Sequence, residues 1–483
     1  MISGSLDQSA ESKGQADTVL SAARMSRDAR FDGKFFVAVK TTGIFCRPIC
    51  PAKLPKEENV VYYTQAAKAM SDGFRPCFRC RPDSAPSSSA WLGVNATVHR
   101  GMSLLSAIPV QNIETIASRL GISERYLYKL FTSALGISPK QYQNMHRALF
   151  AKQLIQQTCL SMTEVAFSAG YQSLRHLQRA MEQYCAATPS QLRQHQRGQH
   201  KTLRLFLSYR PPYNWPYVRA FLATRAIKHM ENVSENSYER FFAFNGASGH
   251  MRVTHDVKRH GFIAEIVLSD LTYLHQTVEN IRSMLDLNAD PVLIEQGLLR
   301  SGLNKEALTP GIRLPSTWSV FESGCRAILG QQVSVKAAVA HVSLLVEHLS
   351  TPSQDEQSVT PQSSTISRAF PTAKAIASSD LHFLRMPLAR KAALREFAQL
   401  FAEKDVDGLH DWPTHEHMLA IKGVGPWTVD YLKMRGERNP DVYLGGDLIV
   451  RKTAEKYPLT PSSAAPWRSY LTLQLWHLSD KSA

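Results

Sequence analysis

Four of the seven cysteines in this 483-residue chain fall in two close pairs, and this arrangement limits what the surrounding segment can fold into. The first pair, Cys46 and Cys50, lies in F-C-R-P-I-C; the second, Cys77 and Cys80, lies in C-F-R-C after 26 intervening residues. Zinc takes four thiolates tetrahedrally, and two short cysteine turns can reach one ion while the longer segment folds around it. The spacing therefore predicts a zinc site with four cysteine ligands. It leaves open whether this site is an inert structural clip or holds a reactive thiolate.

The composition of the whole chain points to a nucleic-acid partner. There are 56 Lys and Arg residues against 41 Asp and Glu residues, which gives a formal net charge of +15. An excess of this size is typical of proteins that bind nucleic acid. The chain is too long for one core, lacks an apolar run long enough to span a membrane, and begins without the features of a signal peptide. We therefore expect a multidomain bacterial protein of the cytoplasm, associated with the nucleoid, in which clustered cysteines bind metal.

The segment around the cysteines has a recognisable pattern. Short β-type runs at Phe35–Val39 and Val60–Tyr63 and one helix at Gln65–Ser71 place the cysteine pairs on loops. The motifs K-T-T-G-I-F-C-R-P-I-C and G-F-R-P-C-F-R-C-R-P-D resemble the N-terminal domain of the Ada adaptive-response regulators, over nearly all of that domain.

This resemblance implies that Cys46 takes the methyl group of a DNA methylphosphotriester in one irreversible turnover. Zinc would keep the thiol deprotonated, so that no general base is needed. Methylating one thiolate changes the formal charge of the site from about −2 to about −1, which reduces repulsion towards the DNA backbone. Residues Thr42, Arg47 and Arg75 are the expected DNA contacts of this domain.

A basic segment with an internal repeat follows. The repeat consists of I-A-S-R-L-G-I-S-E-R-Y-L-Y-K-L-F and V-A-F-S-A-G-Y-Q-S-L-R-H-L-Q-R-A-M. Each copy has a glycine at the expected turn between two helices, which is typical of a helix-turn-helix. Two such motifs joined by a helix at Pro139–Gln157 resemble the AraC-type DNA-binding domain. The candidate recognition helices are Ser123–Ala134 and Ser173–Tyr184. Their expected DNA contacts, for each of which a merely solvated helix face is the alternative, are Arg125, Lys129, Arg175 and Arg179.

The second copy departs from the family pattern. Met181 stands where an aromatic is usual, and Ala186 and Ala187 replace the usual glycine near the helix end. The second half of this domain is therefore expected to anchor the DNA backbone more than to read bases.

The back half changes in character after residue 200. Alternating runs between Leu203 and Leu268, with a helix at Tyr217–His229, predict a small antiparallel sheet with helices. From Leu274 onward the period is helical, apart from a polar stretch at Ser350–Arg368. Within it, L-A-I-K-G-V-G-P-W-T-V-D-Y-L predicts a helix-hairpin-helix, whose glycines let backbone N–H groups approach a DNA phosphate.

Asp447, after Gly-Gly and before L-I-V-R-K, is by itself most simply a helix N-cap. However, Y-R-P-P-Y-N-W, R-A-I-L-G-Q-Q-V-S-V, the hairpin, the Gly-Gly-Asp and W-R-S-Y-L-T-L-Q-L-W together resemble the AlkA-type alkylbase DNA glycosylases. The resemblance implies that Asp447 stabilises an oxocarbenium-like transition state. It also implies a pocket that favours cationic alkylpurines by cation–π attraction, with core packing as the alternative for each ring. The implied pocket residues are Phe221, Trp427, Tyr431 and Trp476.

The same resemblance sets limits on the chemistry. Trp427 occupies the position of the lysine that strand-nicking glycosylases use, and no cysteine follows Cys325, so neither lyase activity nor an iron–sulfur cluster is expected. Gln332 stands where a leucine wedge can fill the gap left by a flipped base, and Leu448 stands where an aromatic can follow the aspartate. The expected DNA contacts here are Gln331, Gln332, Gly423 and Gly425, and the hairpin carbonyls implied to bind a monovalent cation belong to Leu419, Ile421 and Val424.

We interpret the chain as a multidomain protein, mainly α with α+β parts. Its expected divisions are a tail (1–17), an Ada-type zinc domain (18–83), a linker (84–100), an AraC-type domain (101–197), an α+β subdomain (201–273) and a helix-hairpin-helix glycosylase domain (274–483). The expected function is methylphosphotriester sensing that activates transcription, together with hydrolytic excision of alkylated bases. The expected partners are double-stranded DNA and RNA polymerase, and we expect a monomer. The alternative is a transcription regulator with structural zinc and a non-catalytic glycosylase-like DNA-binding region.

Overall fold

A computed structural model describes most of the chain. The described residues are 18–28, 31–32, 34–64, 66–77, 79–80, 82, 96–193, 202–244, 247–350, 366–403 and 412–482. The expected tail, most of the expected linker and most of the polar stretch at Ser350–Arg368 lie outside them. Contacts divide the chain into unit 1, which comprises residues up to 198 with 208–211, and unit 2, which comprises 199–207 with 212–483.

The first part of unit 1 is a small sheet that positions the cysteines. Its strands are β1 (Phe36–Val39), β2 (Ile44–Cys46), β3 (Val60–Tyr63) and β4 (Arg75–Pro76), in the order β3-β1-β2-β4. β1 runs antiparallel to β2 and β3, whereas β2 runs parallel to β4. Helix α2 (Ala66–Ser71) packs against the sheet and buries Ala69 with Phe36 and Phe45. Because two parallel strands end at the same edge, β2 and β4 deliver the two cysteine pairs to one place.

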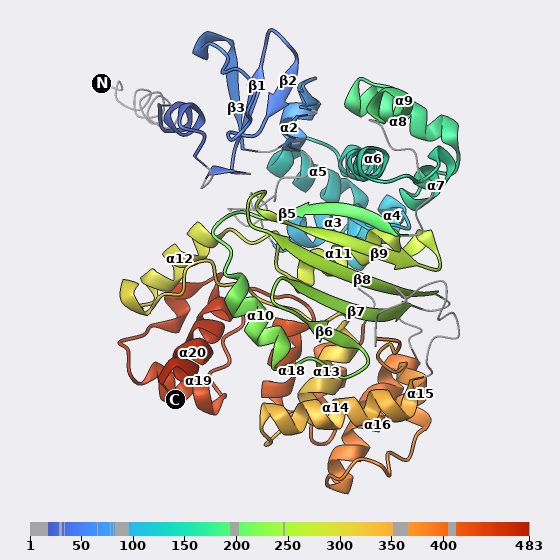
Figure 1. Cartoon of the computed structure of the whole chain (residues 1–483), viewed down its shortest axis with the longest axis vertical. Helices are drawn as coiled ribbons and strands as arrows, with labels where there is room; N and C mark the ends of the chain where they lie inside the picture. Colours follow the sequence, from blue (N-terminus) through green and yellow to red (C-terminus); the bar gives the residue numbers. More distant parts are fainter. Residues whose placement is uncertain are drawn as a thin grey trace. The chain divides into compact units, whose positions relative to one another are not determined.

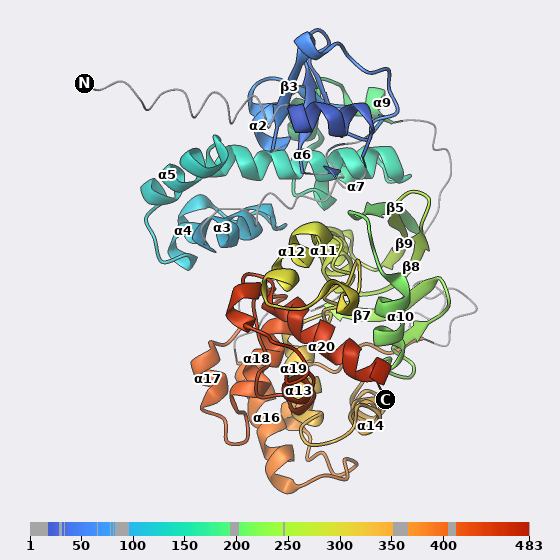
Figure 2. The same cartoon turned by 90° about the vertical axis from the view of Figure 1, so that its left-hand side faces the viewer.

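The second part of unit 1 is the expected pair of helix-turn-helix motifs. Helix α6 has the expected bounds, because Ser138 and Gln141 form a capping box at its start and Thr158 ends it in extended backbone. Figure 2 shows this long helix with α5 at one end and α7 at the other. The helices are α3 (Ala96–Ser106), α4 (Ile113–Arg119), α5 (Glu124–Leu135), α6 (Pro139–Gln157), α7 (Met162–Ser168), α8 (Leu174–Cys185) and α9 (Pro189–Leu192).

Unit 2 begins with the expected sheet. Its strand order is β5-β9-β8-β7-β6, and the pairs from β6 to β9 are antiparallel. The helix expected at Tyr217–His229 is wrong in its second half: α10 (Trp215–Ala223) ends early, and the chain turns at His229, with φ of 65°, into a strand that the sequence did not indicate. The strands are β5 (Leu203–Ser208), β6 (Glu231–Val233), β7 (Ser237–Phe244), β8 (Ala247–Asp256) and β9 (Gly261–Leu268).

The rest of unit 2 is helical, as expected, and Figure 1 shows these helices following the sheet in the yellow to red part of the chain. In the described part of the chain, no helix combines the length and the apolar character needed to cross a lipid bilayer. The helices are α11 (Leu274–Met284), α12 (Pro291–Arg300), α13 (Val320–Leu329), α14 (Val335–Leu349), α15 (Ala373–Ser378), α16 (Leu388–Ala402), α17 (His415–Leu419), α18 (Pro426–Arg435), α19 (Leu448–Ala454) and α20 (Arg468–Ser482).

A large apolar core holds the helix-hairpin-helix in place. Ile421 and Val424 of the hairpin and Leu432 of α18 are buried with α13 and α16 residues, which include Ile328 and Phe397. Burial at roughly 25 cal/mol per Å² of apolar surface makes such a cluster the main source of stability for this part of unit 2. The hairpin is thus a rigid support for the residues on its exposed side.

Candidate functional sites

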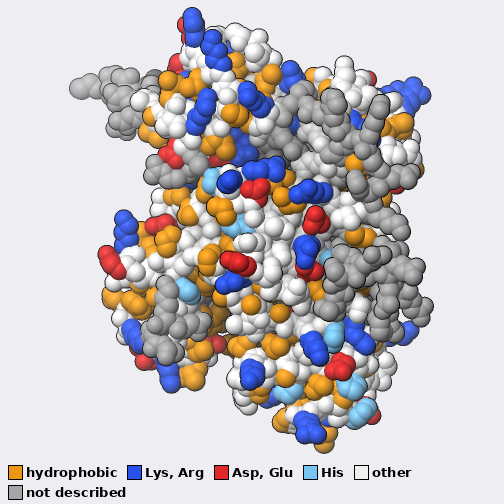
Figure 3. Space-filling view, in the orientation of Figure 1, with side chains coloured by type: hydrophobic (Ala, Val, Ile, Leu, Met, Phe, Trp, Pro, Cys, Tyr) orange, Lys and Arg blue, Asp and Glu red, His pale blue; other side chains and the backbone are white. Residues whose placement is uncertain are grey.

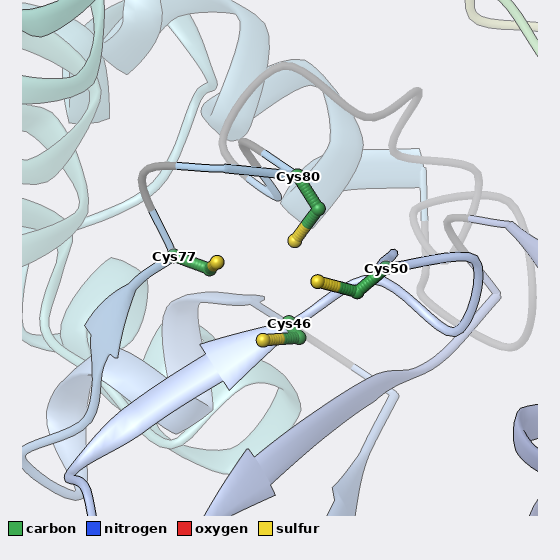
Figure 4. A group of neighbouring side chains, drawn as sticks. All are labelled: Cys46, Cys50, Cys77 and Cys80. Carbon is green, nitrogen blue, oxygen red and sulfur yellow. The ribbon is translucent and has the colours of Figure 1, made fainter. Parts of the chain in front are cut away.

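The four cysteines form the candidate metal centre. Their Sγ atoms all lie within 4.8 Å of one another, and Figure 4 shows them converging from the end of β2, the turn that follows it, and the loop beyond β4. Four thiolates at zinc–sulfur distances of about 2.3 Å stand roughly 3.8 Å apart, so the cluster fits a tetrahedral zinc ion. Cys50, Cys77 and Cys80 are 7–8% exposed, whereas Cys46 is more accessible to solvent. The cluster therefore presents Cys46 to an incoming group.

Arg47 binds within its own domain. Its guanidinium pairs with the carboxylate of Asp32, which is 1% exposed, while its backbone N–H donates to Cys80 Sγ at 3.3 Å and its Nη1 to the Cys80 carbonyl at 3.4 Å. Arg47 thereby connects the two cysteine loops. Asp32 was not singled out in the sequence because nothing in its local pattern shows this long-range partner. The DNA contact expected of Arg47 stays a prediction.

The other expected contacts of this domain lie near the turn between β1 and β2. Thr42 is exposed there, and Gly43 next to it has a φ of 62°, which favours glycine. The backbone N–H of Arg75 donates to the Gly43 carbonyl at 2.8 Å, so this residue lies beside the same turn. The structure thus brings Thr42 and Arg75 together.

The two candidate recognition helices of unit 1 are built alike. Ser123 and Ser173 are their N-caps, and each accepts a hydrogen bond from a backbone N–H three residues later. The expected contacts are exposed on both helices, opposite a buried face on which Met181 of α8 takes the place of an aromatic. Ala186 ends α8 in the left-handed region with φ of 50°, where Gly136 ends α5 with φ of 73°. The exposed contacts are Arg125, Lys129, Arg175 and Arg179.

The helix-hairpin-helix is connected to the turn before α14 by one side chain. Gln331 Nε2 donates to the Gly423 carbonyl and to Thr428 Oγ1, both at 2.9 Å. Gln332 is exposed beside it with φ of 55°. Gly423 has a φ of 95° and makes the tight turn, and Gly425 caps α18. Gln331 thus fixes the turn before α14 against the hairpin, and both of these loops are expected to face DNA. Gln332 faces solvent.

Asp447 is both a helix N-cap and the centre of a candidate active site. Its Oδ1 accepts hydrogen bonds from the backbone N–H groups of Ile449 and Val450 at 3.0 Å and from the Trp476 indole at 3.1 Å. Among the described residues no hydrogen bond to Oδ2 is found. The cap therefore fixes the carboxylate through one oxygen and leaves the other for a reacting group.

Three of the four expected pocket aromatics form one group of rings, which reaches Asp447 through Trp476. The rings of Trp427 and Tyr431 stack with centroids 5.4 Å apart, and Trp476 lies 6.5 Å from Tyr431. All three are partly exposed, whereas Phe221 is buried at 8% exposure. The fourth ring therefore differs from the others in accessibility.

Two arginines that the sequence reasoning missed surround Phe221. The guanidinium of Arg225 lies 3.8 Å and that of Arg435 lies 4.4 Å from its ring centroid. Nη1 of Arg435 also donates to Tyr431 Oη at 3.3 Å. Each arginine follows a predicted pocket aromatic by four residues, which is one helical turn, and this spacing was the signal that could have found them.

A network of buried ion pairs lies beside these arginines. Arg240 pairs with Glu231 and Glu322, and Arg326 pairs with the same two carboxylates. Burial acts to lower the pKa of Arg240, but the nearby carboxylates, of which Glu322 has the largest effect, raise it above its ordinary value. Arg326 also donates to the Arg225 carbonyl at 3.0 Å, so the network supports the wall of the candidate pocket.

Comparisons with protein families match three parts of the chain. The metal binding domain of Ada matches residues 20–83, a helix-turn-helix domain matches residues 116–195, and the AlkA N-terminal domain matches residues 203–319. These matches confirm the three resemblances and the expected architecture, mainly α with α+β parts.

Comparisons with individual proteins extend over nearly the whole chain. A Mycobacterium tuberculosis protein named probable bifunctional transcriptional activator/DNA repair enzyme AlkA is 34% identical over 93% of this chain and 94% of its own length. The Escherichia coli DNA-3-methyladenine glycosylase 2 is 30% identical over 56% of this chain and 96% of its own length. The Escherichia coli bifunctional transcriptional activator/DNA repair enzyme Ada is 34% identical over 35% of this chain and 47% of its own length.

Proposed function

This chain belongs to the family of bifunctional transcriptional activator/DNA repair proteins, and we propose on this premise that it senses DNA methylation damage at Cys46 and excises alkylated bases with Asp447. The observation that supports the proposal is shared by the two halves. Each presents one reactive atom from a site whose other atoms are buried or bonded: Sγ of Cys46 and Oδ2 of Asp447.

The proposed sensor reaction is a methyl transfer from a phosphotriester. The Cys46 sulfur attacks the methyl carbon, a carbon–sulfur bond forms, the carbon–oxygen bond breaks, and the phosphodiester leaves as an anion. The four cysteines would hold zinc, which would keep the Cys46 thiol deprotonated at neutral pH. Cys50, Cys77 and Cys80 are less exposed to solvent than Cys46 and serve as the remaining ligands.

The proposed consequence is a gain in DNA affinity. Methylation removes one negative charge from the metal site, which lies beside exposed cationic groups, and so favours binding to the phosphate backbone of DNA. The helix-turn-helix pair then binds its promoter and activates RNA polymerase. On the face shown in Figure 3, Lys and Arg side chains are spread widely rather than gathered in one patch. We expect the protein to act as a monomer in the cytoplasm.

The proposed repair reaction is hydrolysis of the bond between an alkylated base and its sugar. The base stacks among Trp427, Tyr431 and Trp476, and Oδ2 of Asp447 stabilises the positive sugar and helps position water. Trp427 stands where a Schiff-base lysine would be needed, so the proposed activity leaves the strand intact. The carbonyls of Leu419, Ile421 and Val424 would hold a monovalent cation, which would supply positive charge to the DNA-facing side of the hairpin.

The test incubates the full chain with methylated duplex DNA and follows two products separately. A methyl mass increment should appear on Cys46, be absent in Cys46→Ala, and persist in the control Cys159→Ala. Release of 7-methylguanine or 3-methyladenine should fall by at least about 100-fold in Asp447→Asn and persist in the control Asp380→Asn, an exposed carboxylate elsewhere in unit 2. Methyl uptake by Cys46→Ala would refute the sensor assignment. Base release by Asp447→Asn at the rate of the unmodified protein would favour a regulator with a non-catalytic DNA-binding region.

A further inference from the structure

Helix α2 of the metal domain packs against two apolar cores at once. Met70, near the C-terminal end of α2, packs with Phe45 and Ala69 in the core of the metal domain. The same side chain packs against the core of the first helix-turn-helix, which contains Leu135 at the end of α5. Among the described residues, Met70 alone belongs to both clusters. These two parts of unit 1 are therefore joined by side-chain packing as well as by the chain.

Lys68 of the same helix lies at the C-terminal end of α5. Gly136 ends α5, and a Cβ atom placed on it would lie 3.1 Å from Cδ of Lys68 and 4.0 Å from its Nζ. The Lys68 amine also donates to Asp72 Oδ1 at 2.6 Å, which fixes the direction of the side chain. The last carbonyl groups of a helix carry partial negative charge, so a cation at this place stabilises α5. Lys68 thus adds an electrostatic contact to the apolar contact of Met70.

The sheet that carries the cysteines reaches the second helix-turn-helix as well. β4, which runs beside β2 and leads to Cys77, lies against α8. Tyr184, near the end of α8, packs on the same cluster that receives Met70. Phe45, which precedes Cys46 on β2, belongs to the metal-domain cluster around Met70. Direct packing therefore connects the cysteine site with both candidate recognition helices.

This packing makes one part of unit 1 depend on the metal state of another. Small zinc domains are generally unfolded without their metal ion, because metal binding supplies much of their folding free energy. An empty cysteine cluster would therefore withdraw Met70 and Lys68 from their places on α5. The core that contains Leu135 would expose apolar surface, and the last turn of α5 would lose its neighbouring cation.

We infer that α2 is an intrachain docking surface whose partner is the helix-turn-helix pair, and that its contacts through Met70 and Lys68 make the order of α5 depend on zinc at the cysteine cluster. The inference needs metal binding by the cysteines but no methyl transfer, so it goes beyond the sensor function proposed above. It also gives that sensor a fixed place. The charge that methylation removes is removed from a domain held against the candidate recognition helices.

The test measures hydrogen–deuterium exchange by mass spectrometry in the full chain, with zinc bound and after a chelator has removed it. The Gly136 N–H donates to the Thr132 carbonyl at 3.0 Å, so exchange in the peptide that contains both residues reports on the last turn of α5. Zinc removal should raise this exchange rate by about 10-fold. Exchange in α13 of unit 2 is the internal control and should change by less than about twofold.

Two variants separate docking from metal binding. Met70→Asp should raise the α5 exchange rate by about 10-fold in the zinc-bound protein, and zinc removal should then add little. Met25→Asp makes the same change at an exposed methionine of the metal domain and should behave as the unmodified protein. Lys68→Glu places a negative charge at the end of α5 and should raise the rate about threefold. Lys56→Glu, at an exposed lysine, is its matched control and should leave the rate unchanged.

Metal analysis of each variant makes the outcomes decisive. An α5 exchange rate that does not respond to zinc removal in the unmodified protein would overturn the inference. Should Met70→Asp lose zinc, Lys68→Glu decides, because it changes an exposed side chain; a rate equal to that of Lys56→Glu would then overturn it. If zinc controls α5 but no methyl group appears on Cys46, the docking surface stands and the proposed sensor function is wrong.

Discussion

The metal centre and the base pocket are assembled in different ways. All four cysteines come from one stretch, Cys46 to Cys80, and two neighbouring parallel strands bring them together. The pocket takes its residues from Phe221 to Trp476, through several helices of unit 2. A metal site imposes its own spacing on the sequence, whereas a pocket needs only that distant side chains converge. The cysteine cluster can therefore be predicted from one stretch of sequence. The balance of charges around the pocket cannot, because it depends on residues that are distant in the sequence.

The largest expected effect tests whether the two sites are independent. Cys80→Ser should abolish zinc retention and methyl uptake, because a structural zinc site contributes roughly 10 kcal/mol or more to folding. Base release should stay within about twofold, since no pocket residue lies in the metal domain. Metal analysis measures zinc retention at the cysteine cluster, and 7-methylguanine release measures the activity of the base pocket. A parallel loss of base release would show that the sites are coupled.

The next effect concerns the residue that holds Arg47. Asp32→Ala leaves a largely buried guanidinium without its carboxylate, at a cost of about 3 kcal/mol in the stability of the metal domain. Thermal unfolding of the full chain, followed for the transition that shifts when zinc is chelated, measures this cost. Glu58→Ala, which removes an exposed carboxylate of the same domain, is the matched control and should change little. An unchanged transition in Asp32→Ala would contradict the role given to the pair.

The third prediction is that the stability of unit 2 depends on pH through Asp286. Burial raises the pKa of Asp286 to about 6, so the folded state binds a proton that the unfolded state has already lost. Stability from this group is present below the ordinary carboxyl pKa and is lost as the pH rises through about 6. Asp286→Asn should remove this loss, which is on the order of 2 kcal/mol at neutral pH. Urea unfolding at pH 4 and pH 7 measures it, and an identical pH dependence in the variant would contradict it.

A smaller effect is expected at the support of the catalytic carboxylate. Trp476→Phe keeps an aromatic ring but removes the indole N–H that donates to Asp447, and base release should fall by about 10-fold. Trp318→Phe, which changes a tryptophan that stacks on Phe242 and, among the described residues, donates no hydrogen bond to Asp447, is the comparison and should keep a rate close to the original. Single-turnover release of 7-methylguanine is the measurement. A full rate in Trp476→Phe would mean that the backbone cap alone orients Asp447.

The smallest effect compares the ends of the two candidate recognition helices. Ala186 has a φ of 50° where Gly136 has a φ of 73°, so Ala186→Gly should stabilise unit 1 by about 0.5–1 kcal/mol. Gly136→Ala should do the reverse, since its Cβ would also meet the Lys68 side chain at 3.1 Å. Denaturant unfolding compares the pair, and effects of the same sign in both variants would contradict the argument.

Local signals predicted much of the fold. The helix-turn-helix repeat predicted α6 and the two candidate recognition helices, and the cysteine spacing predicted the metal cluster. The helix expected at Tyr217–His229 ran too far, because the turn into β6 depends on pairing with β7 rather than on a local breaker. The roles of Cys46 and Asp447 in catalysis stay predictions until the variants are measured.

The sequence by itself determined the cysteine cluster, the helix-turn-helix repeat and Asp447 as a helix cap, because spacing, periodicity and capping are properties of neighbouring residues. Only the tertiary structure decided that Asp32 holds Arg47, that Oδ1 of Asp447 is bonded while Oδ2 is open, and that Arg225 and Arg435 lie on Phe221 without counter-charges among the described residues. The reason is physical: pairing, burial and the charge around a ring depend on which distant side chains meet, and no local pattern records that.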